Sequence, residues 1–333
     1  MKEKLITLLL LFHCSVAFTQ NKPNLSNQNA RPKLVVGLVI DQMRWDFLYR
    51  YYDRYTNDGF KRLMRDGFNC ENTFIPYYPT VTAAGHASIY TGTSPAIHGI
   101  VGNDWYDYDQ QKSVYCTEDK NVTSVGTSNN NGKMSPKNML VTTIGDELKL
   151  ATNFRSKVIG IALKDRGSIL PAGHSADAAY WYDKKTGNFI TSSYYETALP
   201  QWVLDFNAPK RVLDYYQQDW NTLYPIQTYL QSDNDINTYE AHEFDSTQNG
   251  FPYKLKKYAE HNDFDKIFST PQGNALTLEF AKTAIKKEQL GKDSITDLLA
   301  VSISSTDYIG HAFGPNSIET EDTYLRLDRE IAA

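Results

Sequence analysis

Continuous runs of apolar and β-branched residues recur along the chain, at residues 33–40, 156–163 and 297–303. Runs without polar alternation are typical of strands that are buried on both faces of a parallel sheet. Between the last two runs, residues 274–287 carry apolar side chains at helical spacing. Strands that alternate with helices predict an α/β fold built on a doubly wound, mostly parallel sheet.

Other segments complete this pattern. Residues 45–65, with a break near residues 57–59, and residues 320–333 show the spacing of amphipathic helices. Residues 179–182 and 187–191 flank a polar turn and predict a hairpin. Tyr, Trp, Asn and Asp then dominate, so we expect residues 176–270 to form an inserted cap region. The polar stretch 123–137 is typical of a surface loop.

The N-terminus predicts a secretory signal peptide over residues 1–20. A short charged start precedes an apolar run at residues 5–12 that is too short to span a bilayer, and small residues follow it. Lipidation at Cys14 is an alternative, although the bulky His13 precedes it. We expect a flexible leader at 21–32, a globular domain at 33–333, and secretion to the periplasm. No later apolar run is long enough for a transmembrane anchor.

The net charge limits the kinds of molecule that the protein can bind, and the cysteine content bears on whether it contains a disulfide. The net charge of −5 argues against a nucleic-acid-binding surface, which is normally basic. Cys70 and Cys116 remain after removal of a signal peptide, and in an oxidising compartment they form either a disulfide or two buried thiols. The sequence leaves that choice and the oligomeric state open.

Polar residues follow each of the apolar runs. Asp41 follows the first, Lys164 and Arg166 follow the second, and Asp307 and His311 follow the third. The carboxyl ends of parallel strands are where α/β enzymes bind ligands. Asp307 and His311, four residues apart, share one face of a helical turn and suit one divalent metal ion, or form a surface hydrogen-bonded pair.

A threonine opens a short helix of small residues. Thr82 follows the loop at Pro79, and Gly92 ends the helix. A hydroxyl at this position faces the backbone N–H groups and positive dipole end that favour an anion. The alternative is that Thr82 only caps the helix. Asn103, which follows Gly102, is a further polar candidate.

Together these residues resemble one family. The chain is similar to the type I phosphodiesterase/nucleotide pyrophosphatase family of the alkaline phosphatase superfamily, and within it to the PafA-type alkaline phosphatases that use a threonine nucleophile. The resemblance runs from residue 33 to residue 333. The blocks that carry it are Val39-Ile40-Asp41-Gln42, Thr82-Ala83-Ala84-Gly85-His86, Ile89-Tyr90-Thr91-Gly92 through Pro95 and His98-Gly99-Ile100, Gly102-Asn103-Asp104-Trp105, Leu163 to His174, and Ser305 to His311.

The resemblance implies an alkaline-phosphatase-type fold and hydrolysis of small phosphate monoesters through a phosphothreonine at Thr82. It implies two Zn²⁺ ions, one held by Asp41 and Thr82 and the other by Asp307 and His311.

The resemblance also implies how substrate is bound. Asn103 would donate to a phosphate oxygen. Lys164 and Arg166 would favour a dianionic monoester over a monoanionic diester, and the family's diesterases lack this pair. The alternatives are a phosphodiesterase or nucleotide pyrophosphatase on the same scaffold, and a non-catalytic truncated fragment.

The chain departs from the family pattern near its end. In the family a vicinal Asp-His pair and a further His complete the two zinc sites, and none of these follows His311 within the 333 residues. We therefore expect the C-terminal part of the fold to be missing, and zinc to bind poorly. We expect His86, His98 and His174 to be packing or hydrogen-bonding residues rather than ligands.

Overall fold

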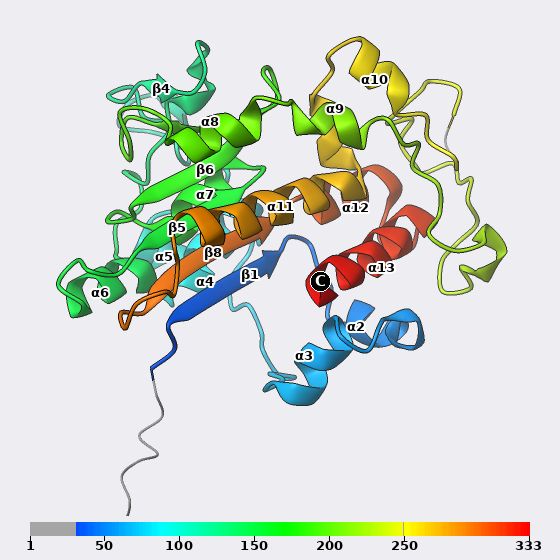
Figure 1. The fold of residues 1–333 in the computed structure, drawn as a ribbon, viewed down its shortest axis with the longest axis horizontal. Helices are drawn as coiled ribbons and strands as arrows, with labels where there is room; N and C mark the ends of the chain where they lie inside the picture. The colour runs from blue at the N-terminus through cyan, green and yellow to red at the C-terminus, as the bar shows by residue number, and fades with distance from the viewer. Residues whose placement is uncertain (1–30, 249) are drawn as a thin grey trace, which may run out of the picture. The chain divides into compact units, whose positions relative to one another are not determined.

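A six-stranded sheet in the order β1-β8-β5-β6-β7-β4 organises the described part of the chain (Figure 1). Adjacent strands from β1 to β6 in this order are parallel. Strand β7 pairs antiparallel with β6, and β4 pairs antiparallel with β7. The mostly parallel α/β sheet is confirmed. Its strands are β1 (Leu34–Ile40), β4 (Ser124–Val125), β5 (Val158–Ala162), β6 (Ala178–Asp183), β7 (Asn188–Ser192) and β8 (Asp297–Ile303).

The computed structural model describes residues 31–248 and 250–333. The predicted signal peptide, Cys14 and leader residues 21–30 lie outside the described residues. Residues 33–333 pack as one unit. Within the described residues, no helix has both the length and the apolar character needed to cross a bilayer.

The register of the parallel strands aligns their carboxyl ends. Ile40 at the end of β1 pairs with Ile303 at the end of β8, and Ala162 at the end of β5 pairs with both Ser302 and Trp181. The residues that follow these strands therefore meet at one edge of the sheet.

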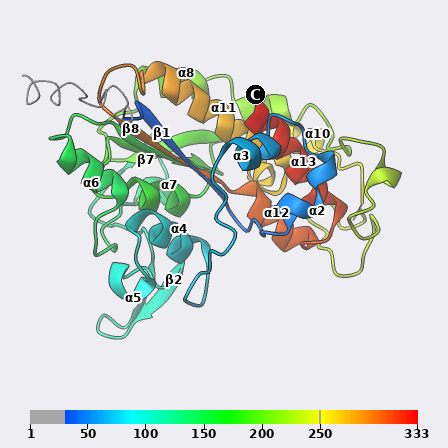
Figure 2. The same ribbon diagram turned by 90° about the horizontal axis from the view of Figure 1, so that it is seen from below.

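Helices cover both faces of the sheet (Figure 2). On one face lie α8 (Gln201–Asn207) and α11 (Pro271–Lys287); on the other lie α4 (Thr82–Thr91), α6 (Ile144–Ala151) and α7 (Asp165–Ala172). Gly160 in β5 allows close packing of α7, because a Cβ there would lie 2.2 Å from the carbonyl oxygen of Ser168. Under α11 the core is aromatic: Phe280 stacks on Phe189 with ring centroids 3.9 Å apart.

The cap region starts later than the sequence predicted. Residues 178–192 form the expected hairpin, but β6 pairs with β5, so both strands extend the main sheet. The expected start at residue 176 is therefore wrong, because a strand rich in Tyr and Trp resembled insertion sequence. Beyond the hairpin lie α8, α9 (Arg211–Tyr215), η4 (Ile226–Thr228), α10 (Lys256–Glu260) and η5 (Asp265–Ser269).

The predicted surface loop at 123–137 is partly ordered into the sheet. It contains β4 and the 3-10 turn η3 (Asn130–Gly132). Asp183 accepts hydrogen bonds from Asn129 Nδ2 and Asn131 Nδ2 at 2.9 and 2.7 Å, which ties this loop to the end of β6.

The remaining elements include the expected helices. The segment 45–65 is divided into short helices, and the C-terminal helix begins two residues before the expected start. The elements are α2 (Phe47–Arg50), η2 (Tyr52–Arg54), α3 (Phe60–Asp66), α5 (Pro95–His98), β2 (Asp104–Asp107), β3 (Lys112–Tyr115), α12 (Ser305–Phe313) and α13 (Ile318–Ala332).

Acidic residues of α13 are buried rather than solvated. Asp322 accepts hydrogen bonds from Trp220 Nε1 at 2.9 Å and from Arg326, and Glu321 pairs with Arg54 at 2.6 Å. The amide of Phe60 donates to Asp328 at 2.7 Å. Buried carboxylates need such partners, so α13 anchors the loops around it through its polar side chains.

The two cysteines in the described part of the chain are free thiols. Cys116 is fully buried and Cys70 is exposed. The disulfide alternative is therefore absent from this structure. Burial raises the pKa of Cys116 well above its usual value, so this thiol packs as a small apolar residue.

Candidate active site

One ammonium group joins the carboxyl ends of β1, β5 and β8. Lys164 precedes α7 and follows β5, Asp41 follows β1, and Asp307 lies in the first turn of α12 after β8. Lys164 Nζ donates to Asp41 Oδ2 at 2.6 Å and to Asp307 Oδ2 at 2.5 Å. The Lys164 side chain is only 2% exposed. The structure thus brings together charges that lie far apart in the sequence.

Thr82 lies against this cluster instead of capping its helix. Val81 is the N-cap of α4 and Thr82 is its first helical residue, so the capping interpretation is wrong. Thr82 Oγ1 donates to Asp41 Oδ2 at 3.1 Å and accepts from Lys164 Nζ at 3.2 Å. Fully buried Ala83 and Ala87 let the helix approach its neighbours closely.

Asn103 reaches the same end of α4. Its Oδ1 accepts a hydrogen bond from the amide of Ala83 at 3.0 Å, and its backbone carbonyl accepts from the amide of Cys116 at 2.9 Å. Because Oδ1 is engaged by the helix N-terminus, the Nδ2 group is the part of this amide that can donate to a ligand.

Arg166 lies beside the cluster. It donates to Tyr115 Oη at 3.0 Å, and Tyr115 in turn donates to Asp165 at 2.7 Å. Arg166 and Lys164 line the same cavity, of about 310 Å³. Among the described residues, the buried Nε of Arg166 has no hydrogen-bond partner. Arg166 thus brings a positive charge to this cavity, while its buried Nε is left without a partner among the residues described, which is costly.

The predicted Asp307–His311 pair is present. His311 Nε2 lies 3.3 Å from Asp307 Oδ1, and the His311 side chain is 73% exposed. The imidazole therefore borders solvent, whereas the carboxylate also belongs to the buried cluster through Lys164.

The histidines expected to hydrogen-bond do so. The ring of His86 joins the carbonyl of Thr82 to Ser302 Oγ, with both distances 2.8 Å, and so fixes α4 to β8. Burial lowers the pKa of His86 below 6.5. His98 Nε2 lies 2.9 Å from Ser88 Oγ, and His174 Nε2 lies 3.0 Å from the carbonyl of Met139. All three rings therefore make the expected hydrogen bonds.

The charges of the cluster are mutually stabilised. Burial works against the charged form of Asp41, but attraction to Lys164 and His86 and hydrogen bonds from Lys164 and Thr82 outweigh it and lower the pKa of Asp41. The carboxylate is thus ionised, and it orients the hydroxyl of Thr82.

The donors for zinc are of suitable types but too few. Zinc binds carboxylate and imidazole groups, usually with at least three protein ligands. Among the described residues, no group of three or more His, Cys, Asp or Glu side chains could hold an ion. The residues present therefore fit part of each expected zinc site, and Lys164 balances the two carboxylates.

Sequence reasoning missed an aromatic and cationic part of the site. The ring centroid of Tyr308 lies 5.0 Å from Lys164 Nζ and 5.2 Å from Lys184 Nζ. The sequence pattern predicts that Lys184 lies in the hairpin turn of an inserted region. The signal that could have found it is its position directly after β6, a parallel strand of the main sheet.

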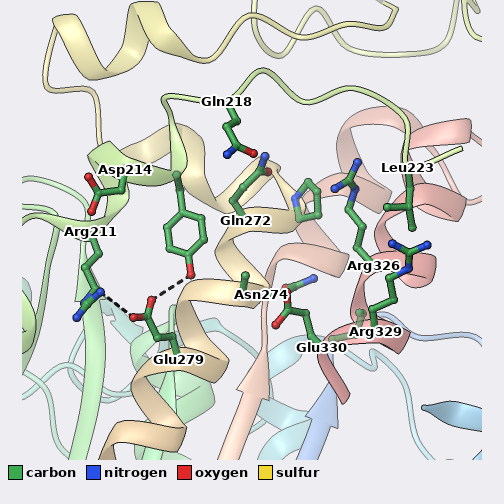
Figure 3. Close-up of a pocket in the computed structure, with 14 residues that line it drawn as sticks. Arg211, Asp214, Gln218, Leu223, Gln272, Asn274, Glu279, Arg326, Arg329 and Glu330 are labelled. Carbon is green, nitrogen blue, oxygen red and sulfur yellow. Dashed lines mark hydrogen bonds and ion pairs between the residues drawn. The ribbon is translucent and has the colours of Figure 1, made fainter. Parts of the chain in front are cut away.

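A separate cavity of about 520 Å³ lies between α9, α11 and α13 and contains none of the predicted site residues (Figure 3). Arg211 pairs with Glu279 at 2.8 Å, and Tyr215 also donates to Glu279. The lining carries equal numbers of acidic and basic side chains and none of the predicted site residues, so the strand-end cluster remains the candidate active site.

The sheet and its strand-end cluster define a doubly wound α/β protein with a charged candidate site at the carboxyl ends of the parallel strands. The chain belongs to the type I phosphodiesterase / nucleotide pyrophosphatase family, whose model matches residues 35–333.

Relatives place the chain more closely within the family. It is 59% identical to "Alkaline phosphatase PhoV" of Synechococcus elongatus, over 99% of this chain and 61% of the relative. It is 60% identical to a Myroides odoratus protein named "Calcium-transporting ATPase", over 92% of this chain and 56% of the relative.

Solved structures agree with the fold. The crystal structure of wild-type alkaline phosphatase PafA matches with a TM-score of 0.89 and 55% identity, over 91% of this chain and 58% of that one. A PafA variant with one Thr, one Asn, one Lys and one Arg replaced matches with a TM-score of 0.88, 53% identity, and coverage of 91% and 59%. The chain thus spans between 56% and 61% of the length of these relatives.

Proposed function

We propose that the complete protein is a secreted alkaline phosphatase that hydrolyses phosphate monoesters, with Thr82 as nucleophile. The observation that carries this proposal is the placement of the Thr82 hydroxyl. It lies at the first residue of α4, and its hydrogen bonds go to Asp41 and Lys164 rather than to its own helix. A helix N-terminus attracts the phosphoryl group, and the hydroxyl is the nucleophile nearest to it.

The remaining side chains supply donors to the phosphoryl oxygens. Asn103 presents Nδ2, Lys164 presents its ammonium group, and Arg166 has a buried Nε without a partner among the described residues. A monoester is a dianion, and two cations favour it over a monoanionic diester. The PafA variant replaces one residue each of the types Thr, Asn, Lys and Arg, the types of these four residues, which supports a shared site.

The reaction balances without any further reactant than water. The Thr82 oxygen bonds to phosphorus as the ester P–O bond breaks, and the alcohol leaves with the threonine proton. Water then replaces the threonine oxygen on phosphorus, which releases inorganic phosphate and restores the hydroxyl.

We infer that two zinc ions belong to the complete site. Asp41 and Thr82 would hold one ion and Asp307 and His311 the other, with further ligands from outside the described residues. Zinc would make the Thr82 hydroxyl more acidic and would stabilise the negative charge on the leaving oxygen. If those ions held Asp41 and Asp307, Lys164 would be able to donate to a phosphoryl oxygen. A periplasmic location rests on the signal-like pattern of residues 1–20.

The test uses the complete polypeptide with 4-nitrophenyl phosphate and a ³²P-labelled monoester. We expect Thr82→Ala to abolish both hydrolysis and acid-stable labelling, and Thr82→Ser to move the label to serine. Thr91→Ala, at the other end of α4, is the matched control. A chelator should remove activity and Zn²⁺ should restore it. Full activity in Thr82→Ala, or a label on another residue, would refute the proposal.

A further inference from the structure

The strand that neighbours β5 also ends in a cation. Asp41, Asp307 and Lys164 follow β1, β8 and β5, and Lys184 follows β6. Because Ala162 pairs with Trp181 in the parallel register, β5 and β6 end at the same edge of the sheet. Carboxylates thus follow β1 and β8 at this edge, and lysines follow β5 and β6.

Lys184 and Lys164 lie close to one aromatic ring. Their Nζ atoms are 5.2 and 5.0 Å from the centroid of Tyr308, so the two ammonium groups are no more than about 10 Å apart. Lys184 Nζ also lies 4.4 Å from the ring centroid of Phe268. Tyr308 and Phe268 meet edge to face, with centroids 4.9 Å apart, and form a rigid aromatic wall beside the two cations.

Two cavities share this wall. One, of about 310 Å³, is lined by Lys164 and Arg166; the other, of about 350 Å³, is lined by His311. Lys184, Phe268 and Tyr308 line both cavities. Lys184 therefore borders both the cavity of the proposed phosphoryl-binding cations and the cavity that His311 lines. The part of a monoester that extends beyond its phosphoryl group is the leaving group, so this is the part that Lys184 can contact.

The charge of Lys184 can be redirected to a ligand. Its partner Asp265 lies 2.7 Å away, and the two side chains are 40% and 54% exposed. Exposed ion pairs contribute little net stability, so an incoming anion can replace Asp265 at low cost. Burial opposes the charge on Lys184, but Tyr308 and Asp265 outweigh it and raise the pKa of Lys184 above 10.5. The lysine therefore stays positive.

We propose that Lys184 is a specificity-determining residue that favours phosphate monoesters whose leaving group carries a second negative charge. The second anion would lie within about 10 Å of the transferred phosphoryl group, the largest separation of the two ammonium groups. This proposal rests on the proposed phosphatase function. Lys184 binds the leaving group and not the reacting bond, so its contribution is to KM for anionic substrates.

The test compares phenyl phosphate with 4-carboxyphenyl phosphate on the complete polypeptide. The ratio of their kcat/KM values is measured in the wild type and in Lys184→Met, so that the intrinsic reactivities of the two esters cancel. We expect the ratio to fall about tenfold in the variant, mainly through KM for the carboxylated ester, because a charge-assisted contact is lost. Lys184→Gln should give the same result if Lys184→Met folds poorly.

Two further variants test whether Lys184 acts through its charge or only by supporting the local structure. Lys185→Met removes the neighbouring exposed lysine, which lines neither cavity, and should leave the ratio unchanged. Asp265→Asn removes the competing carboxylate and should raise the ratio. A merely structural role for Lys184 predicts no rise in Asp265→Asn, and that outcome would overturn the proposal.

A binding measurement separates the proposed role of Lys184 from the proposed phosphatase function. Calorimetry with phenylphosphonate and 4-carboxyphenylphosphonate reports the preference without turnover. If the wild type hydrolyses neither ester, the proposed function fails, while the phosphonate ratio still tests Lys184. If both esters are hydrolysed and the ratio is the same in Lys184→Met, the function stands and the role of Lys184 is refuted.

Discussion

Lys164 Nζ lies 2.5 Å from Asp307 Oδ2, a contact that joins the end of β5 to the end of β8. The same nitrogen also binds Asp41, so one buried cation balances two carboxylates that are 11% and 14% exposed. Without it, Asp41 would lose the attraction that outweighs the cost of its burial. The stability of this edge of the sheet and its affinity for anions therefore depend on the same residue.

Removal of this cation should destabilise the metal-free chain. We expect Lys164→Met to lower the free energy of unfolding by about 3 kcal/mol, the loss typical when one partner of a buried ion pair is removed. Urea denaturation in the presence of a chelator measures it. Adding Asp41→Asn should recover part of the loss, because it removes one uncompensated charge. Lys185→Met is the surface control; an equal loss in that variant would contradict the explanation.

Glu319 should make stability fall as pH rises. Burial raises the pKa of Glu319 from 4.5 to about 8, against the hydrogen bond from Tyr253. Between these values the folded protein keeps a proton that the unfolded chain releases. The contribution of Glu319 to stability is therefore fully present below pH 4.5 and is lost towards pH 8, by up to about 1.4 kcal/mol per pH unit.

The matched variants for this effect are Glu319→Gln and Glu260→Gln, since Glu260 is exposed on α10. Denaturation midpoints at pH 5, 6.5 and 8 compare them. Glu319→Gln should flatten the profile and be more stable than the wild type at pH 8, whereas Glu260→Gln should follow the wild type. A wild-type profile without this decline would show that Glu319 is ionised in the folded state.

Lys164 and Arg166 should discriminate between ester classes in the complete polypeptide. We expect a phosphate monoester to be hydrolysed faster than the matching diester. Alanine at either position should cost the monoester about 1.5–3 kcal/mol of transition-state stabilisation, the range for hydrogen bonds to charged groups. The diester should lose less, because it carries less negative charge. Equal losses in kcat/KM for both esters would show that this pair does not select the dianion.

Zinc should bind weakly to residues 33–333 alone. Asp41 with Thr82 and Asp307 with His311 provide at most two donors for each ion, and Lys164 competes for both carboxylates. Calorimetric titration of the isolated chain should give an affinity far below that of a three-ligand site. His311→Ala should weaken the binding further. Tight binding of two ions would mean that other residues complete the sites.

The strand ends were predictable because the parallel strands are uniformly apolar. The first charged residue after each of the three apolar runs is Asp41, Lys164 or Asp307. The sheet topology then brings these three residues together. The surrounding Pro, Gly and Ala residues pointed to the helix start at Thr82, which the structure places against Asp41 and Lys164. In these cases local sequence and global fold favour the same position.

Long-range contacts account for what the sequence did not predict. The amphipathic spacing of residues 320–333 does not predict that acidic residues of α13 are buried, yet buried Asp322 accepts a hydrogen bond from Trp220, about a hundred residues away in the chain. Lys184 was assigned to an insertion because β6 is rich in aromatic residues, and only its pairing with β5 reveals its place in the site. The bridging of Asp41 and Asp307 by Lys164 depends on distances that no local pattern encodes.

An exposed edge of β1 leads to the last prediction. β1 pairs with β8, and among the described residues no strand pairs with its other edge. Val35 and Val36 are 40% and 50% exposed, although their run has the composition of a buried strand. Next to it, a cavity of about 690 Å³ is lined largely by apolar side chains of β1 and of residues 43–48 and 70–74. An open, apolar strand edge is a template for pairing between chains.

Residues 33–333 expressed alone should therefore be inactive and self-associate. Light scattering and sedimentation should show oligomers that grow with concentration, and Val36→Lys should reduce them, because a charge at the edge disfavours strand pairing. Ile144→Lys adds the same charge at an exposed apolar position of α6 and is the matched control. Equal solubilisation by both substitutions would point to net charge rather than to the β1 edge. A monomeric, cooperatively melting chain would refute the prediction altogether.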